Sequence, residues 1–266
     1  MKILCPTDFS EGSLRAVELA SHIASISDSE VMFINVFQEP RAAGRLGSIR
    51  DLIQKNTEDD LKEFLNDLPM VRRLGERWSY QVIGGHSADI IVRYASVKKY
   101  DLIIMGTQGS SSLSNIIIGS TAQYVLNHTN VPVLVAPDYP IKFEFLKNTA
   151  LMLDDKPIEE NVLKPISSFL SLLNTKTVIY HLVDGDKHPI YDPMANMFLG
   201  EFIKDVVIEK GDDPIEAIKS YVKMNEIGLV FMIRHKHTWW ERIFMQSNTD
   251  IGVFSMDVPL FVTPSK

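Results

Sequence analysis

The stretch Asp101-Leu102-Ile103-Ile104-Met105-Gly106-Thr107-Gln108-Gly109 decides the fold, together with Gly119-Ser120-Thr121-Ala122, which follows Gly109 after nine residues. Leu102–Met105 is a short apolar run, which predicts a strand buried on both faces. A helical pattern begins at Ser120, with Ala122, Val125 and Leu126 on its inner face. The order strand, glycine loop, helix predicts an α/β unit.

The order of elements occurs twice along the chain. Two blocks recur 147 residues later and two recur 127 residues later: Ile3–Asp8 in Ala150–Asp155, Val31–Val36 in Val178–Val183, Asp101–Met105 in Gly228–Met232 and Val131–Pro137 in Val258–Pro264. Chance similarity among buried strands is the alternative explanation. Constant offsets favour a repeat, with domains at 1–142 and 143–266 and a seam in the turn-like cluster near Asp138–Pro140.

Each domain is predicted to be a doubly wound, mainly parallel five-stranded sheet. In the first domain the predicted strands are Ile3–Cys5, Val31–Phe37, Tyr80–Ile83, Leu102–Met105 and Val131–Val135. Helices capped or opened by Ser10, Ser87 and Ser120 alternate with them. The stretch Ile49–Pro69 predicts an extra amphipathic helix, which packs on the core or, alternatively, covers a partner.

Composition excludes several classes of protein. The chain has 266 residues, of which 45% are hydrophobic and 23% charged, so disorder is excluded. Its net charge of −7 argues against a broad nucleic-acid surface. No apolar stretch of about 18 residues occurs, and a carboxylate at Asp8 comes too early for a signal peptide. We therefore expect a cytoplasmic protein that contacts neither membrane nor nucleic acid, with its single cysteine, Cys5, buried and inert.

The glycine-containing loop has the features that anion binding requires. Glycines let the backbone approach a ligand closely and adopt positive φ, and free amides at a helix N-terminus attract negative charge. The loop lacks the Gly-Lys-Ser/Thr of a Walker A motif and the Gly-x-Gly-x-x-Gly of dinucleotide-binding folds. Simple turns followed by a helix cap are the structural alternative.

These motifs together resemble the universal stress protein family. The family pattern Gly-x2-Gly-x9-Gly-Ser/Thr is matched by Gly106, Gly109, Gly119 and Ser120, its first-strand aspartate by Asp8 and its last strand by Val131–Val135. Since the resemblance covers both copies of the repeat, the chain resembles a tandem member of the family, with the adenine-nucleotide alpha-hydrolase-like fold. The resemblance implies a pocket for ATP or a related adenine nucleotide, with Mg²⁺. It assigns the phosphates to Gly106, Gly109, Gly119, Ser120 and Thr121, and the nucleoside to Pro6, Thr7, Asp8, Val36 and Met105.

The chain departs from the family pattern in two places. No lysine or arginine occurs from Gly106 to Ile141, which predicts modest ATP affinity in the first copy. In the second copy the three glycines are replaced by Ile233, Lys236 and Gln246, and only the serine persists, as Ser247. We therefore expect this domain to be degenerate and not to bind nucleotide.

The loop Arg234–Arg242 of the second copy has three readings. Two of them are functional: a metal site formed by His235 and His237, and an anion-binding loop. Packing of Trp239 and Trp240 against the core or the repeat interface is favoured.

The sequence favours a regulatory module over an enzyme. No nucleophile–base pair is evident, His86 is interpreted as part of a helix start, and no catalytic or metal-binding residue is predicted. The leading hypothesis is a stress-response protein that senses an adenine nucleotide. A nucleotide-independent scaffold for protein partners and a slow ATP hydrolase are the alternatives.

The last strand of each copy raises the question of assembly. Both are proline-flanked, and a parallel sheet leaves its edge strands unpaired. In the resembled family this strand joins two subunits, so Val131–Val135 is expected to pair with Val258–Val262 in an internal pseudo-dimer. A plain edge strand in each domain is the alternative, and dimerisation of the whole chain is left open.

Overall fold

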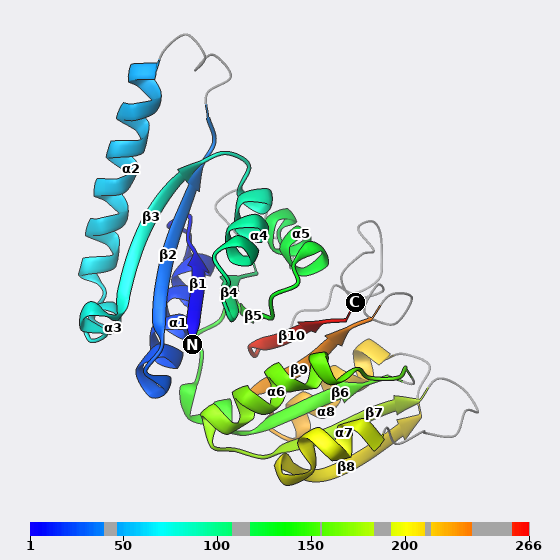
Figure 1. Cartoon of the computed structure of the whole chain (residues 1–266). Helices are drawn as coiled ribbons and strands as arrows, with labels where there is room; N and C mark the ends of the chain where they lie inside the picture. Colours follow the sequence, from blue (N-terminus) through cyan, green and yellow to red (C-terminus); the bar gives the residue numbers. More distant parts are fainter. Residues whose placement is uncertain are drawn as a thin grey trace. The chain divides into compact units, whose positions relative to one another are not determined.

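A computed structural model describes residues 1–39, 47–107, 118–154, 156–183, 193–210, 214–235 and 257–265. The chain divides into two compact units, unit 1 (Met1–Asp138) and unit 2 (Tyr139–Lys266), coloured from blue to green and from green to red in Figure 1. Each unit has its own set of parallel strands and helices and is described separately.

Unit 1 is a doubly wound α/β sheet. Its elements are β1 (Lys2–Pro6), α1 (Glu11–Ser27), β2 (Glu30–Phe37), α2 (Gly47–Asp67), α3 (Pro69–Arg72), a 3-10 turn (Gly75–Arg77), β3 (Trp78–Gly84), α4 (Ser87–Val97), β4 (Leu102–Gly106), α5 (Ser120–His128) and β5 (Val133–Ala136). The strands run parallel in the order β3-β2-β1-β4-β5. Helix α1 contacts α3, and α4 contacts α5 (Figure 1). Strand order reverses between β1 and β4, so their carboxyl ends form the switch point of this sheet, where such folds bind ligands.

The predicted class is confirmed, with local differences from the expected elements. Ser10 caps α1 and accepts a hydrogen bond from the Ser13 N–H, as predicted. The prediction that Ser87 caps α4 is wrong, because His86 is the N-cap residue and makes no side-chain capping bond. Strand β5 begins at Val133, two residues later than expected, because Val131 and Pro132 precede the paired segment.

The predicted extra helix is α2, and it is only partly a core element. Leu61 and Leu65, in its C-terminal half, are completely buried. Ile49 and Leu52, in its first turns, are 42% and 57% exposed. The helix therefore packs on the sheet through one half and leaves apolar side chains uncovered in the other.

Strands β1 and β4 form the centre of the unit 1 core. Ile3, Leu4 and Cys5 of β1 and Ile103 and Ile104 of β4 have no exposed surface, as expected for central parallel strands. Burial raises the pKa of the Cys5 thiol, so the thiolate needed for reactivity is disfavoured.

Unit 2 has the same strand order as unit 1. It contains a 3-10 turn (Phe143–Lys147), β6 (Thr149–Leu153), α6 (Glu160–Leu173), β7 (Thr177–Val183), α7 (Pro193–Leu199), a 3-10 turn (Gly200–Phe202), β8 (Ile203–Lys210), α8 (Pro214–Met224), β9 (Leu229–Arg234) and β10 (Leu260–Pro264). Its five strands are parallel in the order β10-β9-β6-β7-β8. Strand β6 therefore has the position that β1 has in unit 1, and β9 has the position of β4. Phe169, Phe231 and Phe261 contact one another in its core. No helix in the described parts of either unit is both long and apolar enough to cross a membrane.

Candidate functional site

The segment after β1 is held by side-chain hydrogen bonds that form the first half of the candidate site. Thr7 is 4% exposed, and its hydroxyl oxygen lies 3.0 Å from that of Ser13. The Asp8 carboxylate accepts hydrogen bonds from the Ser10 N–H, at 3.2 Å, and from the Ser10 hydroxyl, at 2.5 Å. Ser10 in turn caps α1. Asp8 is thus held at the carboxyl end of β1, at the switch point, by its hydrogen bonds to the residue that caps α1.

Asn35 supports this segment from the neighbouring strand, and sequence reasoning missed it. Its side chain is buried in β2, and its Nδ2 donates a hydrogen bond to the Thr7 carbonyl oxygen at 2.9 Å. The Thr7 N–H donates to the Ile34 carbonyl at 2.8 Å, so both backbone polar groups of Thr7 are bonded to β2. The signal in the sequence was a polar residue inside the apolar run Val31–Val36, since buried polar groups are hydrogen-bonded.

Phe9 adopts an unusual backbone conformation beside Asp8. Its φ of 66° lies in the left-handed region, which bulky residues avoid. Its ring meets that of Phe64 in α2 edge to face, with centroids 5.5 Å apart. The contact links α2 to the segment that carries Asp8.

Gly106 ends β4 where the start of α1 passes close to the sheet. A Cβ atom at this position would lie 2.4 Å from the Gly12 carbonyl oxygen and 2.6 Å from its carbon. Gly106 does not have positive φ, so the conformational part of the prediction is wrong for this residue. It is required by close packing between backbones, and this contact places the N-terminus of α1 against β4.

Gly119 opens α5 and is joined to the end of β4. Its N–H donates a hydrogen bond to the Thr107 carbonyl oxygen at 2.7 Å. It is the N-cap residue, with φ −65° and ψ 156°, and it makes no side-chain capping bond. Any residue can adopt these angles, so the backbone conformation does not require glycine here. The helix begins at Ser120, as predicted, and the first N–H groups of a helix lack partners within it.

The remaining predicted residues lie near these ends or outside the described part. Pro6 is the last residue of β1, Val36 is half-buried in β2, and Met105 is 5% exposed in β4. Thr121 is half-buried in the first turn of α5. Gly109 lies outside the described residues. The structure thus brings the ends of β1 and β4 to one switch point, with α5 beginning after β4.

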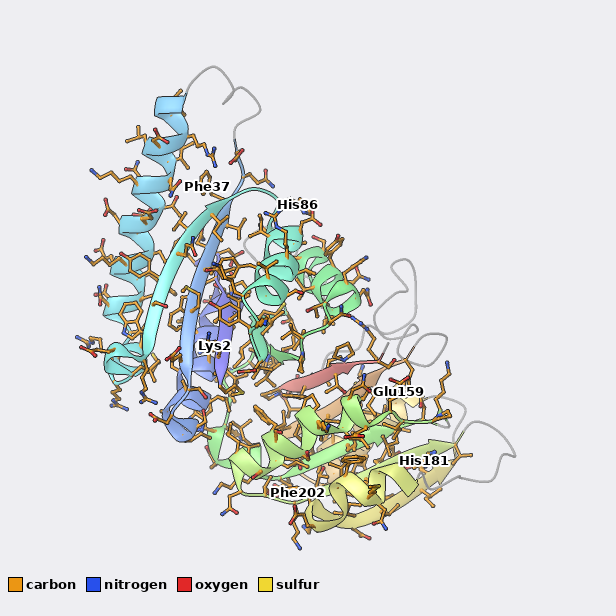
Figure 2. The ribbon with its side chains drawn as sticks, in the orientation of Figure 1. Lys2, Phe37, His86, Glu159, His181 and Phe202 are labelled. Carbon is orange, nitrogen blue, oxygen red and sulfur yellow. The ribbon has the colours of Figure 1, made fainter. Side chains whose placement is uncertain are left out.

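A polar cluster joins α4 and α5 beside the candidate site. His86 Nδ1 lies 3.1 Å from an Asp89 carboxylate oxygen, and the Tyr124 hydroxyl donates to the other at 2.7 Å. The hydrogen bond from Tyr124, followed by the charges of His86 and His128, lowers the pKa of Asp89. Figure 2 shows His86 and Phe37 at the same end of the unit 1 sheet, opposite Lys2. The helix-start position expected for His86 is confirmed.

The switch point of unit 2 is occupied by a different arrangement. His235 Nδ1 lies 3.0 Å from Asp154 Oδ1, and the two side chains are 8% and 10% exposed. Asp154 follows β6 and His235 follows β9, so this pair stands where unit 1 has Thr7 and the start of its glycine loop. Ile233, which replaces Gly106, is 3% exposed.

The Arg234–Arg242 loop of unit 2 is described only as far as His235. His237, Trp239 and Trp240 lie outside the described residues, as do Asp155, Lys236, Gln246 and Ser247. Burial lowers the pKa of Arg234. Among the residues that are described, no three histidine, cysteine, aspartate or glutamate side chains gather closely enough to hold a metal ion.

Comparisons with known proteins agree with this architecture. The universal stress protein MJ0531 of Methanocaldococcus jannaschii is 36% identical over 143 residues, which cover 50% of this chain and 80% of that protein. The universal stress protein YxiE of Bacillus subtilis is 25% identical over 146 residues, covering 50% of this chain and 97% of that protein.

A solved structure covers both units. The crystal structure of a universal stress protein from Archaeoglobus fulgidus matches 99% of this chain and 98% of its own, with a TM-score of 0.77 and 21% identity, which shows a shared fold. Residues 1–137 match the profile of the universal stress protein family. One such match in a chain of 266 residues fits a tandem member. On this match and the relatives above, the chain belongs to the universal stress protein family.

Proposed function

We propose that unit 1 binds ATP or a related adenine nucleotide at its switch point and acts as a regulatory or sensing module in a stress response. The observation that carries the proposal is Gly119. Its φ of −65° can be adopted by any residue, so the backbone does not require glycine here. Gly119 nevertheless stands directly before the helix whose first amides follow the glycine loop. A residue without a side chain at this place leaves room for a ligand to reach those amides.

The proposed ligand spans both halves of the site. Its phosphates lie over Gly106, Gly109, Gly119 and the hydroxyls of Ser120 and Thr121. Its nucleoside lies toward the residues that end β1, β2 and β4: Pro6, Thr7, Asp8, Val36 and Met105. The bonds from Asn35 and Ser13 hold the Thr7–Asp8 segment in place before the ligand arrives, which lowers the ordering cost of binding.

Mg²⁺ is expected to accompany a triphosphate. This ion is usually held by one or two carboxylates, water and the nucleotide's own phosphates rather than by a protein cage. Such an ion arrives with the nucleotide and is held mainly by its phosphates, so the proposal requires no cluster of protein ligands.

Calorimetry with Mg-ATP tests the proposal. Gly119→Val should abolish binding while the unliganded protein still folds, because valine can adopt the observed angles and the poorer helix cap costs about 1 kcal/mol. Thr121→Val, which replaces the hydroxyl by a methyl group, should weaken binding about tenfold through the loss of one hydrogen bond to a charged group. Thr57→Val in α2 is the matched control and should bind normally. Absence of heat with wild type, or unchanged binding in Gly119→Val, would remove the proposal.

We also propose that residues 143–266 form a degenerate copy of the domain that does not bind nucleotide. The buried Asp154–His235 pair supports this, because its side chains stand at the equivalent switch point, with Asp154 at the position of Thr7 and His235 just after the end of β9. Calorimetry should give one nucleotide per chain, and a stoichiometry of two would contradict the proposal. The predicted pairing of Val131–Val135 with Val258–Val262 stays a prediction.

A scaffold function is a second candidate, favoured by α2. Its first turns expose Ile49 and Leu52 by 42% and 57%, and exposed apolar side chains on one helix are typical of protein contacts. Under this candidate the double change Ile49→Ser and Leu52→Ser abolishes partner capture without affecting nucleotide binding. If the double variant still captured a partner, the first turns of α2 would be excluded as the contact surface.

A further inference from the structure

A strained residue beside Asp8 links helix α2 to the candidate site of unit 1. The φ of Phe9 is 66°, a conformation that glycine and asparagine adopt readily and that bulky side chains avoid. The Phe9 side chain is 39% exposed, so burial in the core does not account for a phenylalanine at this position. Strain of this kind persists only where the surrounding structure holds it in place.

The hydrogen bonds around Phe9 show what its conformation does for the segment. The Phe9 N–H donates to the Thr7 hydroxyl oxygen at 3.3 Å. The Asp8 carboxylate accepts hydrogen bonds from the N–H and the hydroxyl of Ser10. Because Asp8 and Ser10 flank Phe9, these bonds close a tight turn across it. The backbone conformation of Phe9 therefore helps to set where the Asp8 carboxylate stands relative to the start of α1.

The Phe9 ring is held by a helix that is itself anchored on the sheet. It meets the Phe64 ring edge to face, with centroids 5.5 Å apart and an angle of 88° between the planes, one of the favoured geometries for an aromatic pair. Phe64 is next to Leu65 and three residues after Leu61, and both leucines are completely buried. Helix α2 packs on β2 and β3 (Figure 1). The Phe64 ring is thus presented to Phe9 from a fixed element.

The turn itself does not need this ring contact, as unit 2 shows. By the repeat offset of 147 residues, Lys156 takes the position of Phe9 and Asp154 that of Thr7. The Lys156 N–H donates to Asp154 Oδ1 at 3.1 Å, which repeats the bond from the Phe9 N–H to the Thr7 hydroxyl. A lysine has no ring to place against a phenylalanine. The aromatic contact at this position therefore belongs to unit 1, the unit that is proposed to bind nucleotide.

We infer that Phe64 is a positioning residue for nucleotide binding in unit 1, an inference that rests on the proposed function. Through its contact with Phe9 it holds Asp8 at the nucleoside end of the site, and it does not touch the ligand itself. Displacement of the Phe64 ring therefore changes nucleotide affinity. Because such coupling is reciprocal, nucleotide binding in turn strengthens the contact between Phe9 and α2.

Calorimetry on the full chain with Mg-ATP and with AMP tests the inference. Phe64→Leu removes the ring and keeps an apolar side chain. It should weaken binding about two- to tenfold, the range expected for the loss of one aromatic pair. The factor should be the same for both ligands, because Asp8 lies at the nucleoside end that they share. Phe64→Tyr keeps the ring and should bind within about twofold of wild type.

Leu61→Val is the matched control in the same helix. It shortens a buried neighbour of Phe64 and leaves the ring, so it should lower the free energy of unfolding without changing nucleotide affinity. If Leu61→Val weakened binding as much as Phe64→Leu, general loosening of α2 would be the cause and the inference would be overturned. A loss in Phe64→Leu that differed between Mg-ATP and AMP would also overturn it.

A double-mutant cycle with Phe9 separates coupling from independent damage. Phe9→Leu should weaken binding by a factor similar to that of Phe64→Leu. In the Phe9→Leu background, Phe64→Leu should add less than a twofold loss, because the contact is already gone. Losses that multiplied in the double variant would show that the two rings act separately, which contradicts the inference.

Hydrogen exchange of the unliganded protein keeps this inference distinguishable from the proposed function. The Ser10 and Ser13 amides are bonded to the side chains of Asp8 and Ser10. They should exchange about two- to tenfold faster in Phe64→Leu, and at the wild-type rate in Leu61→Val. If wild type bound neither Mg-ATP nor AMP, the proposed function would fail. Equal exchange in Phe64→Leu and wild type would instead overturn the link between Phe64 and the turn that carries Asp8.

Discussion

Replacing Gly106 by alanine should destabilise unit 1, because the start of α1 passes too close to β4 for a side chain. The new Cβ would lie 2.4 Å from the Gly12 carbonyl oxygen, and 3.2 Å from the Ser13 nitrogen. Real Cβ atoms stay beyond about 3.0 Å, so the two backbones must separate by roughly 0.6 Å. Ser13 also bonds to Thr7 and Ser10, so this end of α1 cannot yield without weakening those bonds. Overpacking of this kind costs about 1–3 kcal/mol.

Hydrogen exchange measured by mass spectrometry places this loss within the chain. Amides of α1 and β4 in Gly106→Ala should open with a free energy about 1–3 kcal/mol lower than in wild type. Amides of β6 and β9 in unit 2 should be unchanged, since effects at separate sites are independent.

Gly119→Ser is the control, because the N-cap angles accept serine and a serine cap differs from glycine by only a few tenths of a kcal/mol. If Gly106→Ala exchanged like wild type, the close approach of α1 and β4 would not be the reason for glycine at this position. If Gly119→Ser were destabilised as strongly as Gly106→Ala, the distinction between the two glycines would be refuted.

Three further predictions concern side chains outside the glycine motif. Asn35→Leu should leave the Thr7 carbonyl oxygen without its side-chain donor, which lowers the free energy of unfolding in urea by about 1–3 kcal/mol and weakens nucleotide binding severalfold. Asn35→His keeps a donor and should restore binding. If it does not, this hydrogen bond is not what positions the site. Asp154→Asn should destabilise unit 2 by about 1–3 kcal/mol, because buried His235 loses a charged partner, and equal exchange rates in β6 and β9 would contradict this. Tyr124→Phe should raise the pKa of Asp89 toward its ordinary value, measured by NMR titration. Because the pKa of Asp89 is lowered in the folded protein, its contribution to stability exists above the unfolded pKa and fades as pH falls through the folded one; an unchanged titration in Tyr124→Phe would show that the hydroxyl is not the cause.

The strands were predictable from sequence because central parallel strands are continuous apolar runs. Leu102–Met105 and Val31–Phe37 are such runs, and both lie within the observed strands β4 and β2. The helix starts were predictable only where a side chain caps them. Ser10 makes the expected bond, whereas α4 begins after His86 without one, so the motif around Ser87 gave a start that was one residue off.

The supporting bonds of the site could not be predicted, since they join residues far apart in the chain. Asn35 and Thr7 are separated by 28 positions, and Asp154 and His235 by 81. A single sequence shows each only as a polar residue within or next to an apolar run. Their pairing follows from strand order, because β1 lies beside β2 and β6 beside β9. The sequence signals therefore located the switch point but not the bonds that shape it.

One difference between the two units lies in the packing at the end of the fourth strand of each. In unit 1, Gly106 at the end of β4 lets Gly12 in the first turn of α1 approach closely. The equivalent positions in unit 2, by the repeat offsets, are Ile233 and Glu159. The Ile233 side chain is 3% exposed, and α6 begins at Glu160, two residues later than the position that corresponds to the start of α1. A helix that starts later leaves room for a side chain at the strand end, and an isoleucine there fills that room. Restoring glycine at 233 alone would therefore create a cavity rather than a binding site, because the helix start would still lie too far along the chain.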